Sequence, residues 1–189
     1  MASGTLRAAA AATRREQLLE RARLGDASDV SKLPDKLDAI TLTATTFGTE
    51  GVLYALIGGL AVGIRSGVPR ATLDVDFAVP SSVDREWLSE RLTAAGLVRT
   101  GTFPHSINFK HSSGEPVQLA FDPLFDPMIE RAETLNIDGL ALRVVTKDDL
   151  IAMKRRAAAD PMRRRSKSLR DEADIALLEG DVPEADEGW

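Results

Sequence analysis

The sequence predicts an α+β fold: a small mixed sheet backed by helices, with further helices toward the C-terminal end. Strand and helix signals alternate first, several strand candidates joined by short turns follow, and amphipathic helices come last. At 189 residues with 43% apolar residues, the chain is long enough for one core, or for one domain with a small helical appendage.

The first elements follow from helix formers and from glycine and proline punctuation. Residues 5–24 are strong helix formers, but their apolar positions form only a narrow stripe, so this helix is expected either to be solvated or to dock on a partner. A helix is expected over 35–47 after Pro34, and an almost entirely apolar strand over 52–57.

The middle of the chain carries the remaining strand signals. A short buried helix is expected over residues 60–64 and a strand over 73–79, whose apolar residues Leu73, Val75, Phe77 and Val79 should face the core. Ser82 is the expected N-cap of a helix over 84–95. Strands over 97–103, 106–111 and 116–121 then follow, the last two joined as a hairpin.

The final elements alternate once more before the helices. A helix over residues 126–132 precedes two strands, 134–137 and 141–144, which flank the two-residue hairpin signal Asp138-Gly139. Thr146 is the expected N-cap of a helix over 147–159, and a last helix covers 166–178. The predicted organisation is an N-terminal helix and linker (1–33), a core (34–145), a C-terminal helical segment (146–178) and an acidic tail expected to be disordered (179–189).

Composition excludes several kinds of chemistry. There is no cysteine, which rules out disulfides, thiolate zinc sites and thiol nucleophiles, and the two histidines, His105 and His111, are typical polar strand residues. The net charge of −5 argues against a generally basic surface. No run reaches membrane-spanning length, and the alanine-rich start carries arginines and glutamates, so the protein is expected to be cytoplasmic with no membrane partner.

One stretch, residues 56–79, carries the candidate site. Gly58 and Gly59 stand between a strand and a helix, where backbone N–H groups can approach an anion closely. Asp74 and Asp76 are two residues apart on an expected strand and should therefore point the same way. Like charges side by side repel, and a divalent cation between them relieves the repulsion. Each feature alone has an ordinary structural explanation, but together they indicate phosphoryl or nucleotidyl transfer.

The same stretch resembles the nucleotidyltransferase superfamily, in which a diglycine precedes an Asp-hydrophobic-Asp motif. It is most similar to the abortive-infection toxin-type nucleotidyltransferases, the AbiEii/AbiGii group, over residues 54–178. The resemblance rests on Gly58-Gly59-Leu60-Ala61, on Arg70-Ala-Thr72-Leu-Asp74-Val-Asp76, on Asp149-Leu150-Ile-Ala-Met-Lys154, and on the segment from Lys167 to Ile175.

This resemblance implies a polymerase-β-like fold that transfers a nucleoside monophosphate from an NTP to an acceptor with Mg²⁺. By it, Asp74 and Asp76 would hold the metal ions and Gly58-Gly59 would cradle the triphosphate. Arg70, Thr72 and Lys154 would complete the nucleotide-binding site. The implied acceptor is a hydroxyl of an RNA (tRNA-like) or a protein, and the implied setting is a toxin with a cognate antitoxin or a phage-defence system.

The chain departs from this family pattern at the third carboxylate. Gln118 stands where an acid is expected, and an amide can neither act as a general base nor bind metal as tightly. Asp122, four residues later on the same strand face, is the candidate replacement as a third catalytic residue. Without such a replacement the protein would be a degenerate transferase that binds a nucleotide or a partner without turnover.

Three positively charged features have two readings each. Arg70 could instead form a salt bridge to Asp74 or Asp76, and Lys154 could lie on a solvated helix face. The only cluster of basic residues in the sequence lies near the C-terminus. It could contact phosphate groups, or its charges could be solvated and paired with neighbouring acids. It comprises Arg155, Arg156, Arg163, Arg164, Arg165, Lys167 and Arg170. A further alternative is an interaction module that uses the N-terminal helix and these basic helices.

Overall fold

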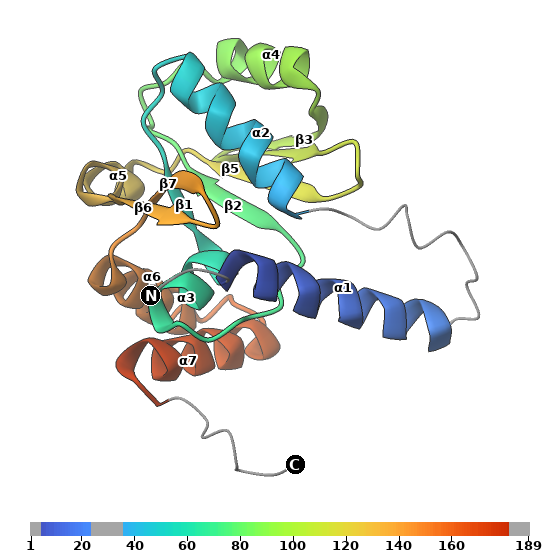
Figure 1. Ribbon diagram of the computed structural model, residues 1–189. Helices are drawn as coiled ribbons and strands as arrows, with labels where there is room; N and C mark the ends of the chain where they lie inside the picture. Colours follow the sequence, from blue (N-terminus) through green and yellow to red (C-terminus); the bar gives the residue numbers. More distant parts are fainter. Residues whose placement is uncertain (1–4, 24–35, 182–189) are drawn as a thin grey trace.

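The computed structural model describes residues 5–23 and 36–181, with side chains in the first segment up to residue 15. Within these residues the chain forms one seven-stranded mixed sheet in the order β3-β4-β5-β2-β1-β7-β6. β1 lies antiparallel to β2 and parallel to β7, and β2 lies parallel to β5. The predicted mixed sheet with helices on it is confirmed (Figure 1).

The sheet is built from seven short strands. They are β1 (Ala55–Ile57), β2 (Val75–Ala78), β3 (Val98–Phe103), β4 (Ser106–Lys110), β5 (Pro116–Ala120), β6 (Glu133–Ile137) and β7 (Leu140–Val144). β6 and β7 form the hairpin predicted at Asp138-Gly139, where both residues have positive φ, 54° and 87°.

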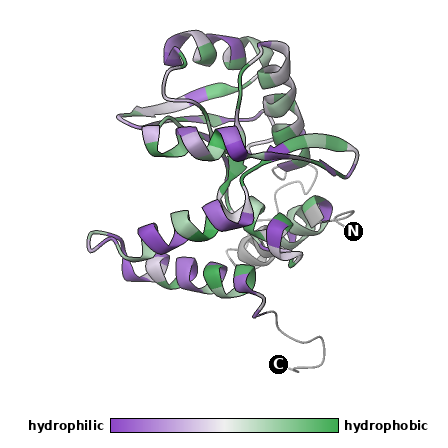
Figure 2. Cartoon of the chain, turned by 90° about the vertical axis from the view of Figure 1, so that its left-hand side faces the viewer, coloured by the Kyte–Doolittle hydropathy of each residue, from purple (hydrophilic) through white to green (hydrophobic). Residues whose placement is uncertain are grey.

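The helices lie on both sides of this sheet. They are α1 (Thr5–Arg23), α2 (Lys36–Thr49), α3 (Gly58–Ser66), α4 (Arg85–Ala95), α5 (Asp126–Arg131), α6 (Lys147–Ala158) and α7 (Arg165–Glu179), with a short 3₁₀ turn, η2 (Pro123–Phe125). Figure 1 shows α2 and α4 above the sheet, and α3, α6 and α7 below it. In the view of Figure 2, α6 and α7 run as a pair beneath the sheet, and hydrophilic residues cover much of this pair.

The two faces of the sheet have different roles. The odd-numbered residues of β2 and β5, with Phe77 and Leu119 among them, are fully buried on the side of α2. There the Phe77 ring packs edge-on against Phe47 of α2, with ring centroids 5.4 Å apart. The even-numbered residues face the other way, and Asp76 and Gln118 are only partly buried. This second face is the polar side of the sheet.

Two local expectations are wrong. β2 begins at Val75, so Asp74 lies in a bend just before the strand, and the Leu73 side chain is 68% exposed and does not reach the core. Asp84, not Ser82, caps α4 and accepts hydrogen bonds from the N–H groups of Glu86 and Trp87. Asp84 is better placed because its carboxylate stands directly before the first helical residue.

The N-terminal helix α1 is docked on the core and is not a solvated helix. Leu6, Ala9 and Thr13, spaced three and four apart, are all buried, and α1 packs on α3 and α2. The predicted linker up to residue 33 and the tail after residue 181 lie outside the described residues. Within the described part of the chain, no helix is both long and apolar enough to cross a membrane.

Candidate functional site

The turn from β1 into α3 is shaped by glycines that leave room for other side chains. Gly58 has a φ of +70°, and a Cβ at this position would lie 2.1 Å from Oδ2 of Asp76. A Cβ on Gly59 would lie 2.4 Å from Nη1 of Arg70 and 3.0 Å from Oγ1 of Thr72. Any larger residue would therefore push these three side chains away from the start of α3.

The start of α3 is suited to an anion. Its N-cap residue is Ile57, whose side chain makes no capping hydrogen bond. The first N–H groups of a helix have no partner within the helix, and the helix dipole adds positive potential there. Because Gly58 and Gly59 carry no side chain, a phosphate can reach these N–H groups directly.

The two carboxylates lie beside this helix start. Asp76 of β2 stands opposite Ile57 of β1, and the hydroxyl of Thr72 donates to Oδ1 of Asp74 at 3.3 Å. Burial and, after it, the negative charge of Asp74 together raise the pKa of Asp76 to about 7. The positive charges of Lys154, Lys36 and Arg70 act in the opposite direction and lower this pKa.

These side chains fit a divalent cation. A cation held by Asp74 and Asp76 would offset both the burial of the Asp76 charge and the repulsion between the two carboxylates, and oxygen donors are what Mg²⁺ prefers. Gln118, next to Asp76, adds a neutral amide oxygen. Among the described residues, however, no cluster of three or more acidic, histidine or cysteine side chains is present, so the set has two carboxylates and no third.

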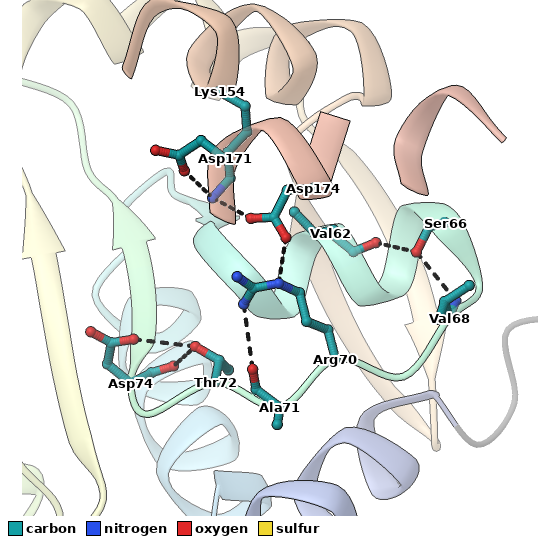
Figure 3. A network of polar contacts seen from close by, with 10 residues as sticks. All are labelled: Val62, Ser66, Val68, Arg70, Ala71, Thr72, Asp74, Lys154, Asp171 and Asp174. Atoms are coloured by element: carbon teal, nitrogen blue, oxygen red, sulfur yellow. Dashed lines mark hydrogen bonds and ion pairs between the residues drawn. The ribbon is translucent and has the colours of Figure 1, made fainter. Parts of the chain in front are cut away.

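A network of charges connects the site to the C-terminal helices (Figure 3). Lys154 of α6 lies between two buried acids of α7, 2.9 Å from Oδ1 of Asp171 and 2.7 Å from Oδ2 of Asp174. Nε of Arg70 forms an ion pair with Asp174. Arg163, before α7, forms an ion pair with Asp171 at 2.5 Å. Three cations thus face two carboxylates, which leaves positive charge available for a phosphate group.

This network distinguishes between the alternatives that the sequence left open for Arg70 and Lys154. Arg70 forms its ion pair with Asp174 and not with Asp74 or Asp76, and its guanidinium lies against the start of α3. Lys154 is 14% exposed and lies inside the network, so a solvated helix face does not describe it. The structure therefore brings Gly58, Gly59, Arg70, Thr72, Lys154 and both aspartates into one site.

Asp122 is not part of this group. In the parallel register of β2 and β5, Asp76 stands beside Gln118, and Asp122 lies four residues further along, about 13 Å at the usual rise of a strand. Its carboxylate caps η2 by accepting the N–H of Leu124 at 3.0 Å. Its position does not favour the role of replacement carboxylate, and Gln118 is the residue beside Asp76.

Sequence reasoning missed several residues of the site. Asp171, Asp174 and Leu178 form the buried stripe of α7, so the signal was two acids at positions where an amphipathic helix places apolar residues. Thr13 of α1 exchanges hydrogen bonds of 3.3 Å with the backbone N–H and C=O of Thr72. Lys36 forms a buried ion pair with Glu115, and no local pattern marks either residue.

Comparisons with known proteins agree with this geometry. The family described as nucleotidyl transferase AbiEii toxin, of type IV toxin–antitoxin systems, matches residues 42–187. That range contains the whole site except Thr13 and Lys36. No functionally curated protein matches the sequence.

Solved structures of three proteins resemble the chain. LnuA, a lincosamide antibiotic adenylyltransferase with lincomycin bound, has a TM-score of 0.56 and 16% identity over 79% of this chain and 99% of LnuA. An antigenic nucleotidyltransferase-like protein from Paracoccidioides brasiliensis has a TM-score of 0.55 and 23% identity over 79% and 78%. The antibiotic-resistance factor ANT(2'')-Ia has a TM-score of 0.55 and 16% identity over 78% and 87%. At these identities the likeness establishes a shared fold.

Proposed function

The chain belongs to the AbiEii family of nucleotidyl transferase toxins, and from this premise we propose that it transfers a nucleoside monophosphate from an NTP to a hydroxyl of an RNA or a protein. The observation that carries the proposal is the contact between the β1–α3 turn and the acidic pair. Gly58 leaves space for Asp76 directly beside the uncapped start of α3. A phosphate site and a cation site are thus adjacent, as the transfer of a nucleotidyl group requires.

Each residue of the site has a part in this reaction. The N–H groups at the start of α3 bind the β- and γ-phosphates, and Arg70 and Lys154 balance their charge. Thr72 orients Asp74 through its hydroxyl. Asp74 and Asp76 would hold Mg²⁺, which when bound polarises the phosphate oxygens.

The proposed reaction is a displacement at the α-phosphorus of the NTP. The acceptor hydroxyl oxygen forms a bond to the α-phosphorus, the bond from that phosphorus to the bridging oxygen breaks, and pyrophosphate leaves with the electron pair. Water takes the hydroxyl proton, because Gln118 beside Asp76 is not a base. Transfer is therefore expected to be slow at low pH, where Asp76 is protonated and holds Mg²⁺ poorly, and to speed up as pH rises past the raised pKa of Asp76.

The test is incubation with each of four α-³²P-labelled NTPs, with Mg²⁺ and one acceptor class at a time. The acceptors are total RNA, lysate protein, and small antibiotics, since LnuA is a lincosamide adenylyltransferase and ANT(2'')-Ia has been solved with adenylyl-2''-tobramycin. Label on RNA or protein that the double variant Asp74→Ala/Asp76→Ala does not produce supports the proposal. Label only on an antibiotic would replace the proposed acceptor, and no label with any NTP would contradict transfer.

A second function is favoured by one observation, the register that sets Gln118 beside Asp76. A degenerate transferase would bind an NTP with Mg²⁺ but not turn it over. The variant Gln118→Asp distinguishes the two functions. A degenerate protein should gain labelling activity from this change, whereas a working transferase is already active as wild type.

The family setting leads to two further parts of the proposal. A toxin of a type IV system needs NTPs and a cellular target, so we propose that it acts in the cytoplasm. A cognate antitoxin should be encoded beside it. Expression of the chain alone should slow growth, and co-expression of the neighbouring reading frame should restore it. If expression of the Asp74→Ala/Asp76→Ala variant slows growth as much as wild type does, the toxicity does not come from nucleotidyl transfer.

A further inference from the structure

A cavity of about 760 Å³ lies between η2, α5 and the C-terminal part of α6. None of the residues gathered at the nucleotide site lines it, so the two sites are separate. A cavity of this volume can hold a small organic molecule. Part of its wall is apolar, and methionine and aromatic side chains adapt well to an apolar group. The apolar side chains with the largest surfaces are Leu124, Phe125, Met128 and Met153.

The same wall carries charges of both signs at the end of α6. Arg156 lies in the last turn of α6, and Asp160 follows four residues later, just past the helix end. Residues four apart along a helix are neighbours on its surface, so the two charged groups are close to each other. Asp160 uses Oδ1 to accept the N–H of Met162 at 2.9 Å, and no ion pair in the described part of the chain engages its carboxylate or the Arg156 guanidinium. Both charges can therefore pair with a ligand.

Arg163 connects this wall to the nucleotide site. Its backbone N–H donates to the C=O of Asp160 at 3.0 Å, and its side chain also lines the cavity. Nε of Arg163 forms an ion pair with the buried Asp171 at 2.5 Å, and Asp171 forms a second ion pair with Lys154 at 2.9 Å. Two consecutive ion pairs therefore lead from the cavity to a lysine of the nucleotide site.

The lining selects the chemistry of the ligand. A purely anionic ligand would meet the carboxylates of Asp122 and Asp160, and a purely cationic ligand would meet Arg156 and Arg163. A ligand that satisfies the whole wall carries one group of each charge and an apolar body. A free α-amino acid with a large apolar side chain has this composition, since its carboxylate fits the planar fork of an arginine and its ammonium group donates to a carboxylate.

We propose that the cavity binds a free amino acid with a large apolar side chain, and that this ligand weakens the binding of NTP. The ligand carboxylate lies between Arg156 and Arg163, its ammonium group faces Asp160, and its side chain packs against Phe125 and Met128.

The effect on the nucleotide site follows from the shared cation. A carboxylate beside Arg163 competes with Asp171 for the positive charge of this arginine. Asp171 then holds Lys154 more strongly, and less positive charge remains for the phosphates of the NTP. The effect on NTP binding rests on the proposed function, whereas the amino-acid site does not depend on it.

Calorimetric titration of the full chain with free amino acids tests the site. L-phenylalanine, L-methionine and L-leucine are the probes, and glycine, which has no side chain, should not bind. N-acetyl-L-phenylalanine lacks the ammonium group and L-phenylalaninamide lacks the carboxylate, so each should bind about tenfold more weakly than L-phenylalanine. If none of the three probes binds, or if both modified ligands bind as well as L-phenylalanine, the proposed site is wrong.

Two substitutions assign the contacts of the ligand. Arg156→Gln should weaken binding of L-phenylalanine about tenfold and should not weaken binding of L-phenylalaninamide, because the contact to the carboxylate is lost only once. Asp160→Asn should weaken L-phenylalanine but not N-acetyl-L-phenylalanine, and its asparagine can still accept the N–H of Met162. Arg170→Gln on α7, exposed and outside the cavity, is the matched control and should bind like wild type. Losses that are equal for all ligands would contradict these contacts.

Titration of each NTP with Mg²⁺, with and without saturating L-phenylalanine, tests the connection to the nucleotide site. L-phenylalanine should raise the Kd of the NTP severalfold, and the NTP should raise the Kd of L-phenylalanine by the same factor. Arg156→Gln should bind NTP like wild type and lose this effect at the same concentration of L-phenylalanine. Binding of L-phenylalanine with an unchanged Kd of every NTP would overturn the coupling. If no NTP binds although L-phenylalanine does, the proposed function fails together with the coupling, and the amino-acid site stands.

Discussion

Without a bound metal ion, the charge of Asp76 should lower the stability of the folded protein, and the isosteric substitution Asp76→Asn should remove this cost. The carboxylate is partly buried beside Asp74, and these two causes raise its pKa from 3.8 to about 7. An acid with a raised native pKa holds its proton more tightly in the folded than in the unfolded chain. Without bound metal, stability therefore falls as pH rises from about 4 to about 7, and the full cost is present above pH 7.

The size of the effect follows from the shift. The rise of about 3 pKa units, at about 1.36 kcal/mol per unit, corresponds to about 4 kcal/mol. Asp76→Asn keeps the shape and removes the charge. In metal-free buffer at pH 8 it should be more stable than wild type by up to about 4 kcal/mol, and at pH 5 by only about 1–2 kcal/mol.

Urea denaturation of both proteins at pH 5 and pH 8 measures this difference. Asp122→Asn is the matched control, since it removes one charge at the cap of η2, where an asparagine can still accept the N–H of Leu124. Added Mg²⁺ should stabilise wild type and not Asp76→Asn. Equal stability of wild type and Asp76→Asn at pH 8, or a difference that does not change with pH, would refute the argument.

Three more substitutions test the surroundings of the site. Gly58→Ala should lower the free energy of unfolding by about 1–3 kcal/mol and abolish NTP binding measured by calorimetry, because the new Cβ would clash with Asp76 and φ is positive. Gly48→Ala is the control: it adds a Cβ in open space on α2 and should not destabilise the protein. Thr13→Val should weaken NTP binding severalfold in the same assay, because the backbone of Thr72 loses its hydrogen bonds to the Thr13 hydroxyl, and Thr13→Ser should restore binding. Unchanged binding by the valine variant would show that Thr13 does not help to position Thr72. Asp174→Asn should lower the free energy of unfolding in urea by about 3 kcal/mol, since Arg70 and Lys154 lose a shared buried partner, and a loss below 0.5 kcal/mol would contradict the network.

Local patterns were sufficient for most of the fold. Each predicted strand is present, and helix ends marked by a clear cap, such as Thr146 before α6, fall where expected. Boundaries were less accurate where side chains compete, as at Asp84 and Ser82, both of which can cap a helix. The diglycine and the Asp-x-Asp pair were found because their chemistry depends on neighbours close in sequence.

Contacts between distant segments could not be predicted from local patterns. Thr13 meets Thr72 across 59 positions, and Arg70 meets Asp174 across 104. The choice of Asp122 as a third carboxylate followed correct strand periodicity, but periodicity gives the face and not the distance. Only the register of β2 and β5 shows that Gln118, and not Asp122, stands beside Asp76.

The buried acids of α7 explain why the C-terminal helices cannot be treated as an appendage to the core. An acid removed from water is costly unless cations surround it, so Asp171 and Asp174 need Lys154, Arg163 and Arg70 in order to be buried. The same contacts hold Arg70 and Lys154 beside the start of α3, where a phosphate would bind. Packing of α7 and assembly of the nucleotide site are therefore one event, and a chain cut before α7 should lose NTP binding even where its sheet still forms.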